Sequence, residues 1–228
     1  MRTNASKALV GLALLLLASL ACNAVSSLTA GGATPVPAEQ TVLLRDDFSK
    51  TDSGWGTGTD TQSSVEYDGG ELRMKIFLDN YFTWSNPDSE TYQNIHMEVT
   101  VKNQGGEAQS GFGLLCNQQP EDASSYYYFA VTSNGEYVIG KSASGQDDLF
   151  LTNDDNWGTS GHIPRNAPSY RLAADCGPRA LALYVNGKKI DSASDTTYTS
   201  GGVGLFLWSG DNPAGEVSYD DFLITQLK

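Results

Sequence analysis

The chain has 228 residues, with 27 acidic against 14 basic side chains and a formal net charge of −13 at pH 7. This balance argues against nucleic acid as a partner, because an acidic surface repels a phosphate backbone. The length, once an N-terminal leader is set aside, fits one all-β domain or two small ones.

Residues 1–21 have the layout of a secretory signal peptide. Arg2 and Lys7 supply a cationic start, no acid is present, and the apolar run that follows is too short to span a bilayer comfortably. Cys22 directly follows a small residue, an arrangement that resembles the lipobox of bacterial lipoproteins, although Ser19 stands where that family usually has Leu. In that family the cysteine is diacylated, so the resemblance implies a lipid anchor at Cys22.

Residues 22–40 have the composition of a flexible tether. After Cys22 the sequence NAVSSLTAGGATPVPAEQ is small, polar and proline-containing, without apolar periodicity. We therefore expect an extracytoplasmic protein, lipid-anchored to the bacterial membrane or cell surface, with one folded domain over residues 41–228. Membrane contact is expected through the anchor only, since no later apolar run is long enough to span. The alternative is a secreted protein that is cleaved nearby, in which Cys22 is incidental.

From residue 41 onward the apolar residues recur with period two, which predicts strands and no helix. The runs at residues 70–77 (GELRMKIF) and 94–101 (NIHMEVTV) alternate apolar with polar side chains. Two Asn-Gly pairs, at 134–135 and 186–187, stand between strand runs and predict hairpins, because both residues tolerate positive φ. Frequent glycines and regular strand spacing favour an antiparallel sandwich.

Two predicted strands lack a polar face. In the runs at residues 124–131 (SSYYYFAV) and 201–208 (GGVGLFLW), apolar or aromatic side chains point to both sides. Such a strand either lies centrally in a sheet, or has one side in the core and the other in a ligand groove.

Cys116 and Cys176 each fall on the apolar face of a predicted strand. Both thiols therefore point inward, and export permits a disulfide between them. A bridge across sixty residues stabilises by about 4 kcal/mol in the chain-entropy model. The alternative is a pair of buried free thiols.

The segment order is LLRDDFSKTDSGW, YDGGELRMK, NIHMEVTV, GFGLLC, YYYFAVTSNGEYVIGK, LALYVNGKKID, GGVGLFLW and VSYDDFLI. This order, over residues 43–224, resembles the concanavalin A-like lectin/glucanase jelly rolls, a group that includes laminin-G-like domains, laminarinase-type glycosidases and many bacterial surface lipoproteins. The resemblance implies an all-β, antiparallel two-sheet jelly-roll sandwich that binds ligands on its concave sheet. It leaves function open, because this fold hosts lectins, hydrolases and interaction domains.

A concave sheet that binds sugar needs aromatic platforms for the C–H faces of the ring and polar groups for its hydroxyls. The candidate ligand-binding residues are Trp84, Tyr126, Tyr128 and Trp208 as platforms, with His96 and Glu98 as polar partners. Each has an ordinary alternative as a core, cross-strand, edge or solvated residue.

Catalysis in the laminarinase-type relatives uses acids in an E-x-D-x-x-E pattern on one concave strand. The comparable strand here has Glu98 alone, with His96 beside it, and nothing resembles a nucleophile elbow, a His-rich metal motif or a phosphate loop. We therefore expect no catalytic residues, and non-catalytic recognition of glycan or another cell-surface polymer. The alternatives are a glycoside hydrolase with a non-standard acidic site and a structural or protein-interaction module.

Two DDF segments contain candidate calcium ligands, and no other cofactor is expected. In the glycosidase relatives an acid just before the aromatic residue of the last strand helps to hold a structural calcium; Asp221 matches that position and Asp47 is the expected neighbour. Alternatively, these acids are solvated or make strand-end hydrogen bonds, while Phe48 and Phe222 pack inward.

Overall fold

The computed structural model describes residues 40–104, 109–211 and 215–228, so the predicted signal peptide, tether and Cys22 lie outside the described residues. The described residues form sixteen strands and no helix, which confirms the all-β prediction. None of them belongs to a helix long and apolar enough to cross a membrane.

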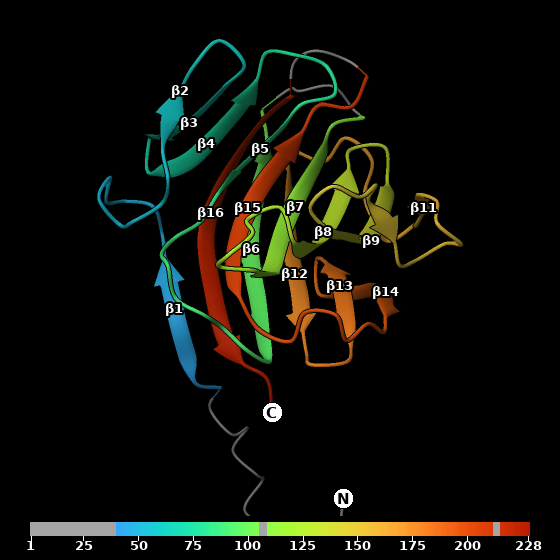
Figure 1. Ribbon diagram of the computed structural model, residues 1–228. Coiled ribbons are helices and arrows are strands. Elements are labelled where there is room, and N and C mark those ends of the chain that lie inside the picture. The colour runs from blue at the N-terminus through green and yellow to red at the C-terminus, as the bar shows by residue number, and fades with distance from the viewer. Residues whose placement is uncertain (1–39, 105–108, 212–214) are drawn as a thin grey trace, which may run out of the picture. The chain divides into compact units, whose positions relative to one another are not determined.

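The larger of two antiparallel sheets has nine strands (Figure 1). They are β1 (Val42–Asp46), β2 (Gly58–Thr59), β3 (Ser63–Asp68), β4 (Glu71–Ile76), β6 (Ile95–Asn103), β12 (Ser169–Cys176), β13 (Leu181–Val185), β14 (Lys188–Ala193) and β16 (Gly215–Gln226). Their order is β14-β13-β12-β6-β16-β4-β3-β2, and β1 also pairs with β16. The first and last strands of the domain therefore lie side by side.

The smaller sheet has seven strands. They are β5 (Phe82–Ser85), β7 (Gly111–Gln118), β8 (Tyr126–Thr132), β9 (Glu136–Ser142), β10 (Leu149–Phe150), β11 (Gly158–Thr159) and β15 (Gly202–Trp208). The order is β10-β9-β8-β7-β15-β5, with β11 paired to β9.

The two Asn-Gly hairpins form where the sequence predicts them. The pair at 134–135 joins β8 to β9, and the pair at 186–187 joins β13 to β14. Gly135, Asn186 and Gly187 all have positive φ, a conformation that Asn and Gly adopt at low cost.

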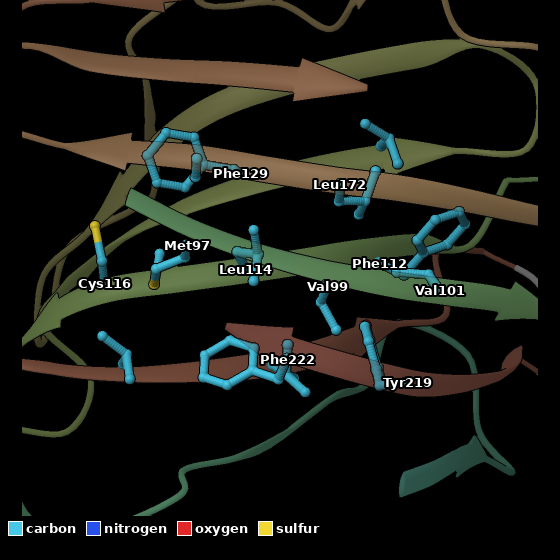
Figure 2. Close-up of a cluster of buried hydrophobic side chains, with 14 of the residues drawn as sticks. Met97, Val99, Val101, Phe112, Leu114, Cys116, Phe129, Leu172, Tyr219 and Phe222 are labelled. Carbon is cyan, nitrogen blue, oxygen red and sulfur yellow. The ribbon is translucent and has the colours of Figure 1, made fainter. Parts of the chain in front are cut away.

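The core fills the space between the two sheets (Figure 2). Alternate residues of β6 face alternate residues of β7 across it, which is the period-two pattern of the sequence expressed in space. The buried core residues drawn in the figure include Met97, Val99, Val101, Phe112, Leu114, Phe129, Leu172, Tyr219 and Phe222.

A disulfide joins Cys116 on β7 to Cys176 on β12, with 6.6 Å between the two Cα atoms. Both cysteines are fully buried. Because β7 and β12 belong to different sheets, the bridge connects the two layers of the sandwich. The predicted pairing is confirmed.

The strands that lack a polar face, β8 and β15, flank β7 in the middle of the smaller sheet. Their inner side chains, such as Phe129 and Leu205, are fully buried in the core. The other side of each strand belongs to the outer face of the smaller sheet, so aromatic residues are left on a face that the larger sheet does not cover.

Candidate functional site

Aromatic side chains surround a pocket of about 490 Å³ on the outer face of the smaller sheet. We call this site the aromatic pocket. Eight aromatic residues line it, namely Phe82, Trp84, Tyr126, Tyr128, Phe150, Trp157, Phe206 and Trp208. They come from β5, β8, β10, β15 and the loop before β11, so the pocket spans most of the width of the sheet.

Strand register brings the rings of β5 and β15 together. Phe206 pairs with Trp84 and Trp208 pairs with Phe82. Since side chains directly opposite on neighbouring antiparallel strands share a face, all four rings project on the outer side. This spacing follows from two short runs, YFTW and LFLW, in which alternate residues are aromatic.

Glycines on the strands between the aromatic ones make room for the rings. A Cβ atom on Gly111 would come within 3.2 Å of the Trp208 ring and 3.4 Å of the Trp157 ring. On β9, a Cβ atom on Gly140 would overlap the ring of Tyr128. At these two glycines the aromatic side chains therefore lie directly against the backbone of the sheet.

The rings are ordered in contacting pairs. Trp157 and Trp208 stack with ring centres 6.0 Å apart and planes 18° from parallel. Phe82 stacks on Phe206 at 5.1 Å and on Tyr126 at 6.1 Å. Rings supported in this way are preorganised, because few rotamers stay available to them.

The rings differ in how much of each reaches solvent. Phe206 and Tyr128 are 2% and 8% exposed and form the base of the pocket, whereas Trp84 is 44% exposed. The other five rings are partly buried. A contiguous apolar surface of this kind often marks an interaction site.

Neutral polar groups and one carboxylate complete the lining, from Asn80, Ser124, Ser142 and Asp148. Among the described residues that line the pocket, Asp148 alone carries a charge. Burial raises the pKa of Tyr126 to about 12, and the negative charge of Asp148 adds to this rise. Burial likewise raises the pKa of Tyr128 far above its ordinary value, with contributions from the charge and a hydrogen bond of Asp148. Both hydroxyls therefore keep their protons at neutral pH.

A strained loop lies between Phe150, at the end of β10, and Trp157. Asn153, Asp154 and Asp155 all have left-handed φ angles, of 57°, 51° and 61°, which cost energy in L-residues although Asn and Asp tolerate them best. The Asp155 carboxylate accepts a hydrogen bond of 2.9 Å from the backbone N–H of Phe150. The loop thereby sets the positions of Phe150 and of Trp157, which follows it.

Four of the six candidate ligand-binding residues meet in the aromatic pocket, namely Trp84, Tyr126, Tyr128 and Trp208. His96 and Glu98 do not. They project from β6 on the outer face of the larger sheet, so they cannot orient a ligand in the aromatic pocket, which corrects the expectation that all six share one face. The sequence pattern reports which residues of β6 face outward, but not which sheet the strand joins.

His96 and Glu98 belong to a polar network on the larger sheet. The Nδ1 atom of His96 contacts Asp175 at 2.6 Å and its Nε2 atom contacts Glu98 at 3.0 Å. Arg171 donates to the second Glu98 oxygen at 2.8 Å and 3.1 Å, and Tyr184 donates to Asp175 at 2.7 Å.

Hydrogen bonds and ion pairs within this network shift the pKa values of its members. The hydrogen bond to Asp175 raises the pKa of His96 above its ordinary value, and the bond to Glu98 adds to the rise. Burial raises the pKa of Glu98 and of Asp175. Hydrogen bonds from His96 to both acids, from Arg171 to Glu98 and from Tyr184 to Asp175, together with the nearby positive charges, outweigh burial and hold both pKa values below their ordinary values. A general acid for glycoside hydrolysis needs a raised carboxyl pKa, so this pair lacks that property.

The two acids predicted to hold calcium line one depression. Asp47 and Asp221 lie there together with Arg45 and Arg171. The Asp47 carboxylate accepts hydrogen bonds from Ser49, and Arg171 donates to the backbone carbonyl of Asp221 at 2.8 Å. Two cationic side chains oppose a divalent cation, and no group of three or more His, Cys, Asp or Glu among the described residues could hold a metal ion. Calcium binding by Asp47 and Asp221 stays a prediction, which the two neighbouring arginines disfavour.

The aromatic residues of both DDF segments pack inward. Phe48 and Phe222 are buried, and each contacts Trp55, with ring centres 5.2 Å and 5.1 Å apart. The indole N–H of Trp55 donates to Asp46 at 2.8 Å. The acids at this edge thus serve strand-end hydrogen bonds.

Sequence reasoning missed half of the aromatic lining and its one acid. The missed residues are Phe82, Phe150, Trp157, Phe206 and Asp148. The sequence does indicate Phe206, since it shares a face with Trp208 in a strand that is apolar on both sides. No such alternation indicates Phe150 and Trp157, because their positions depend on the loop that connects β10 to β11.

No protein-family model matches this sequence, and no curated protein matches it either. Solved structures match at 12–16% identity. They include the carbohydrate-binding module CBM66 from Bacillus subtilis (TM-score 0.58, 15% identity, 76% of this chain and 96% of that one). A Bacillus subtilis protein of unknown function with a galectin-like fold gives 0.61, at 15% identity over 82% and 97%. Bacillus licheniformis β-glucanase gives 0.58, at 16% identity over 82% and 99%. This likeness shows the fold, a concanavalin A-like jelly roll, as the segment order predicts.

Proposed function

We propose that this protein is a lipid-anchored extracytoplasmic protein that binds glycan in the aromatic pocket without cleaving it. The observation that carries the proposal is a group of eight aromatic residues around one pocket, with neutral polar groups among them. A CBM66 carbohydrate-binding module and a β-glucanase share the fold, which adds support.

The proposed mode of binding follows from the chemistry of the lining. The partly exposed rings of Trp157 and Trp208 offer flat apolar faces for the C–H side of a sugar ring, and Trp84 extends this surface. Asn80 and Ser142 supply donors and acceptors for sugar hydroxyls. A pocket with apolar walls and a few convergent polar groups is the usual form of a small-ligand site.

The composition of the lining favours binding over hydrolysis. Glycoside hydrolysis uses two carboxyl groups on either side of the scissile bond. Asp148 is the only carboxyl group among the described residues that line the pocket. We therefore expect no reducing sugar to be released from any oligosaccharide that the protein binds. Release that falls to background in Asp148→Asn would establish the hydrolase alternative instead.

Calorimetric titration of the protein with a panel of neutral oligosaccharides tests the proposal. Trp208→Ala should weaken binding by roughly thirtyfold, because truncating an aromatic anchor at the centre of an interface costs about 2 kcal/mol. Phe77→Ala is the matched control, since Phe77 is 45% exposed and does not line the pocket. Equal affinities for the parent and both variants, or no binding at all, would refute glycan binding in this pocket and favour a protein-interaction module.

The anchor is proposed from the sequence of residues 1–40, with Cys22 as the acylated residue. Many anchored copies would retain a polymeric ligand by avidity even where single contacts are weak. Cys22→Ser should release the protein from the membrane fraction into the soluble fraction. Membrane retention that is unchanged in this variant would exclude acylation of Cys22 as the necessary attachment.

A further inference from the structure

We infer that the aromatic pocket prefers glycans that carry protonated amino groups over neutral and acidic glycans. This inference rests on the proposed function and adds the class of glycan. It depends on three features of the pocket, which are the ring faces, the position of Asp148, and the charge of the remaining lining.

The rings present a negative electrostatic surface to a ligand. The face of an aromatic ring attracts a cation within about 6 Å of its centre, most strongly for Trp and next for Tyr. Three of the protein's four tryptophans line this one pocket, at positions 84, 157 and 208. A bound ammonium group would therefore have several ring faces within reach, whereas a carboxylate would be repelled by each of them.

Asp148 adds a full negative charge at the same place. Asp148 lines the pocket together with Tyr126 and Tyr128, and its charge raises the pKa of both tyrosines. Asp155 adds to the negative field at Tyr128. A carboxylate accepts several hydrogen bonds, so Asp148 can accept one from a tyrosine and another from a ligand ammonium group.

The described lining has no positive charge to offset the negative potential of the rings and Asp148. No Lys, Arg or His is among the described residues of the pocket. Lys141, on the neighbouring strand β9, is engaged elsewhere, since its Nζ atom donates to Asp195 at 2.8 Å and to Thr197 at 2.9 Å. The pocket therefore combines aromatic faces with an acid that no cationic side chain of the described lining neutralises, a combination that discriminates by ligand charge.

A matched pair of ligands tests this inference. Oligomers of glucosamine and of N-acetylglucosamine, equal in length and linkage, differ in that acetylation removes the positive charge. At mildly acidic pH the glucosamine oligomer should bind roughly threefold to tenfold more tightly, given the strength of cation–π and exposed ion-pair contacts. An acidic oligosaccharide of similar length should bind more weakly than either.

Two charge-matched variants locate the preference. Asp148→Asn should lower the affinity ratio of the two oligomers, and the ring faces should account for the preference that remains. Asp47→Asn makes the same change of net charge at an exposed carboxylate that follows β1 of the larger sheet, outside the aromatic pocket, and should leave the ratio unchanged.

The outcomes separate this inference from the proposed function. Equal affinity for both oligomers in the parent would overturn the charge preference and leave glycan binding intact. A ratio that falls equally in the two variants would overturn the role of Asp148 and assign the effect to overall charge. If no neutral, amino or acidic oligosaccharide binds, the proposed function itself fails.

Discussion

Reduction of the Cys116–Cys176 disulfide should lower the free energy of unfolding by about 4 kcal/mol. The bond closes a loop of 60 residues, and it joins β7 of the smaller sheet to β12 of the larger one. The chain-entropy model gives about 14 cal/mol/K for a loop of this length, or about 4 kcal/mol at room temperature. For a chain of about 200 residues, this lowers the melting temperature by roughly 8–16 °C.

Denaturant unfolding of the oxidised and reduced protein measures this difference. A Cys22→Ser background prevents thiol exchange during the experiment, and a Cys116→Ser/Cys176→Ser variant controls for other effects of the reductant. The denaturant dependence of the unfolding free energy should also rise on reduction, because the unlinked denatured chain exposes more surface. A stability loss below about 1 kcal/mol, with that dependence unchanged, would refute the argument that the bridge acts by restricting the unfolded chain.

Three further predictions concern His96 in the polar network of the larger sheet, Asp154 in the loop between β10 and β11, and Gly140 beside the Tyr128 ring. The folded-state pKa of His96 is raised, so its contribution to the free energy of unfolding is full below the unfolded-state pKa and is lost as pH rises through the folded-state pKa. Denaturant unfolding of the parent and of His96→Gln at several pH values should therefore show a stability difference that shrinks as pH rises. The same pH dependence of stability in both proteins would contradict this prediction. Asp154→Gly should stabilise the protein by about 0.5–1 kcal/mol by relieving a left-handed φ of 51°, and a lower denaturation midpoint would argue against strain there. Gly140→Ala should displace the Tyr128 ring, lower the free energy of unfolding by about 1–3 kcal/mol and weaken oligosaccharide binding. Unchanged stability and unchanged affinity in titrations would show that the contact between Gly140 and Tyr128 does not shape the pocket.

Much of the sandwich could be predicted because it depends on local rules. Alternation along 70–77 and 94–101 marks β4 and β6, and Asn-Gly at 186–187 marks the β13–β14 hairpin. The inward positions of Cys116 and Cys176 followed from the same alternation, since each shares a face with apolar neighbours on its strand. These features need only a few consecutive residues to be recognised.

The candidate site could be predicted only in part, because it depends on how strands are assigned to sheets. Tyr128 and Trp208 stood out because their strands are apolar on both sides. A shared site for His96 and these residues requires β6 and β8 to lie in one sheet, but β6 joins the larger sheet. Trp157 reaches the pocket through a loop of three left-handed residues, and its position follows from backbone geometry that no alternation rule describes.

The four tryptophans of the chain provide the most direct test of glycan binding in the aromatic pocket. Trp84, Trp157 and Trp208 line the pocket, whereas Trp55 is 4% exposed in the core and its indole N–H is bonded to Asp46. An oligosaccharide that binds can be titrated into isotope-labelled protein while NMR follows the indole N–H signals. The signals of the three pocket tryptophans should shift, and the Trp55 signal should stay in place. Pocket signals that stay fixed while the oligosaccharide binds would contradict the account, because the sugar would then lie elsewhere.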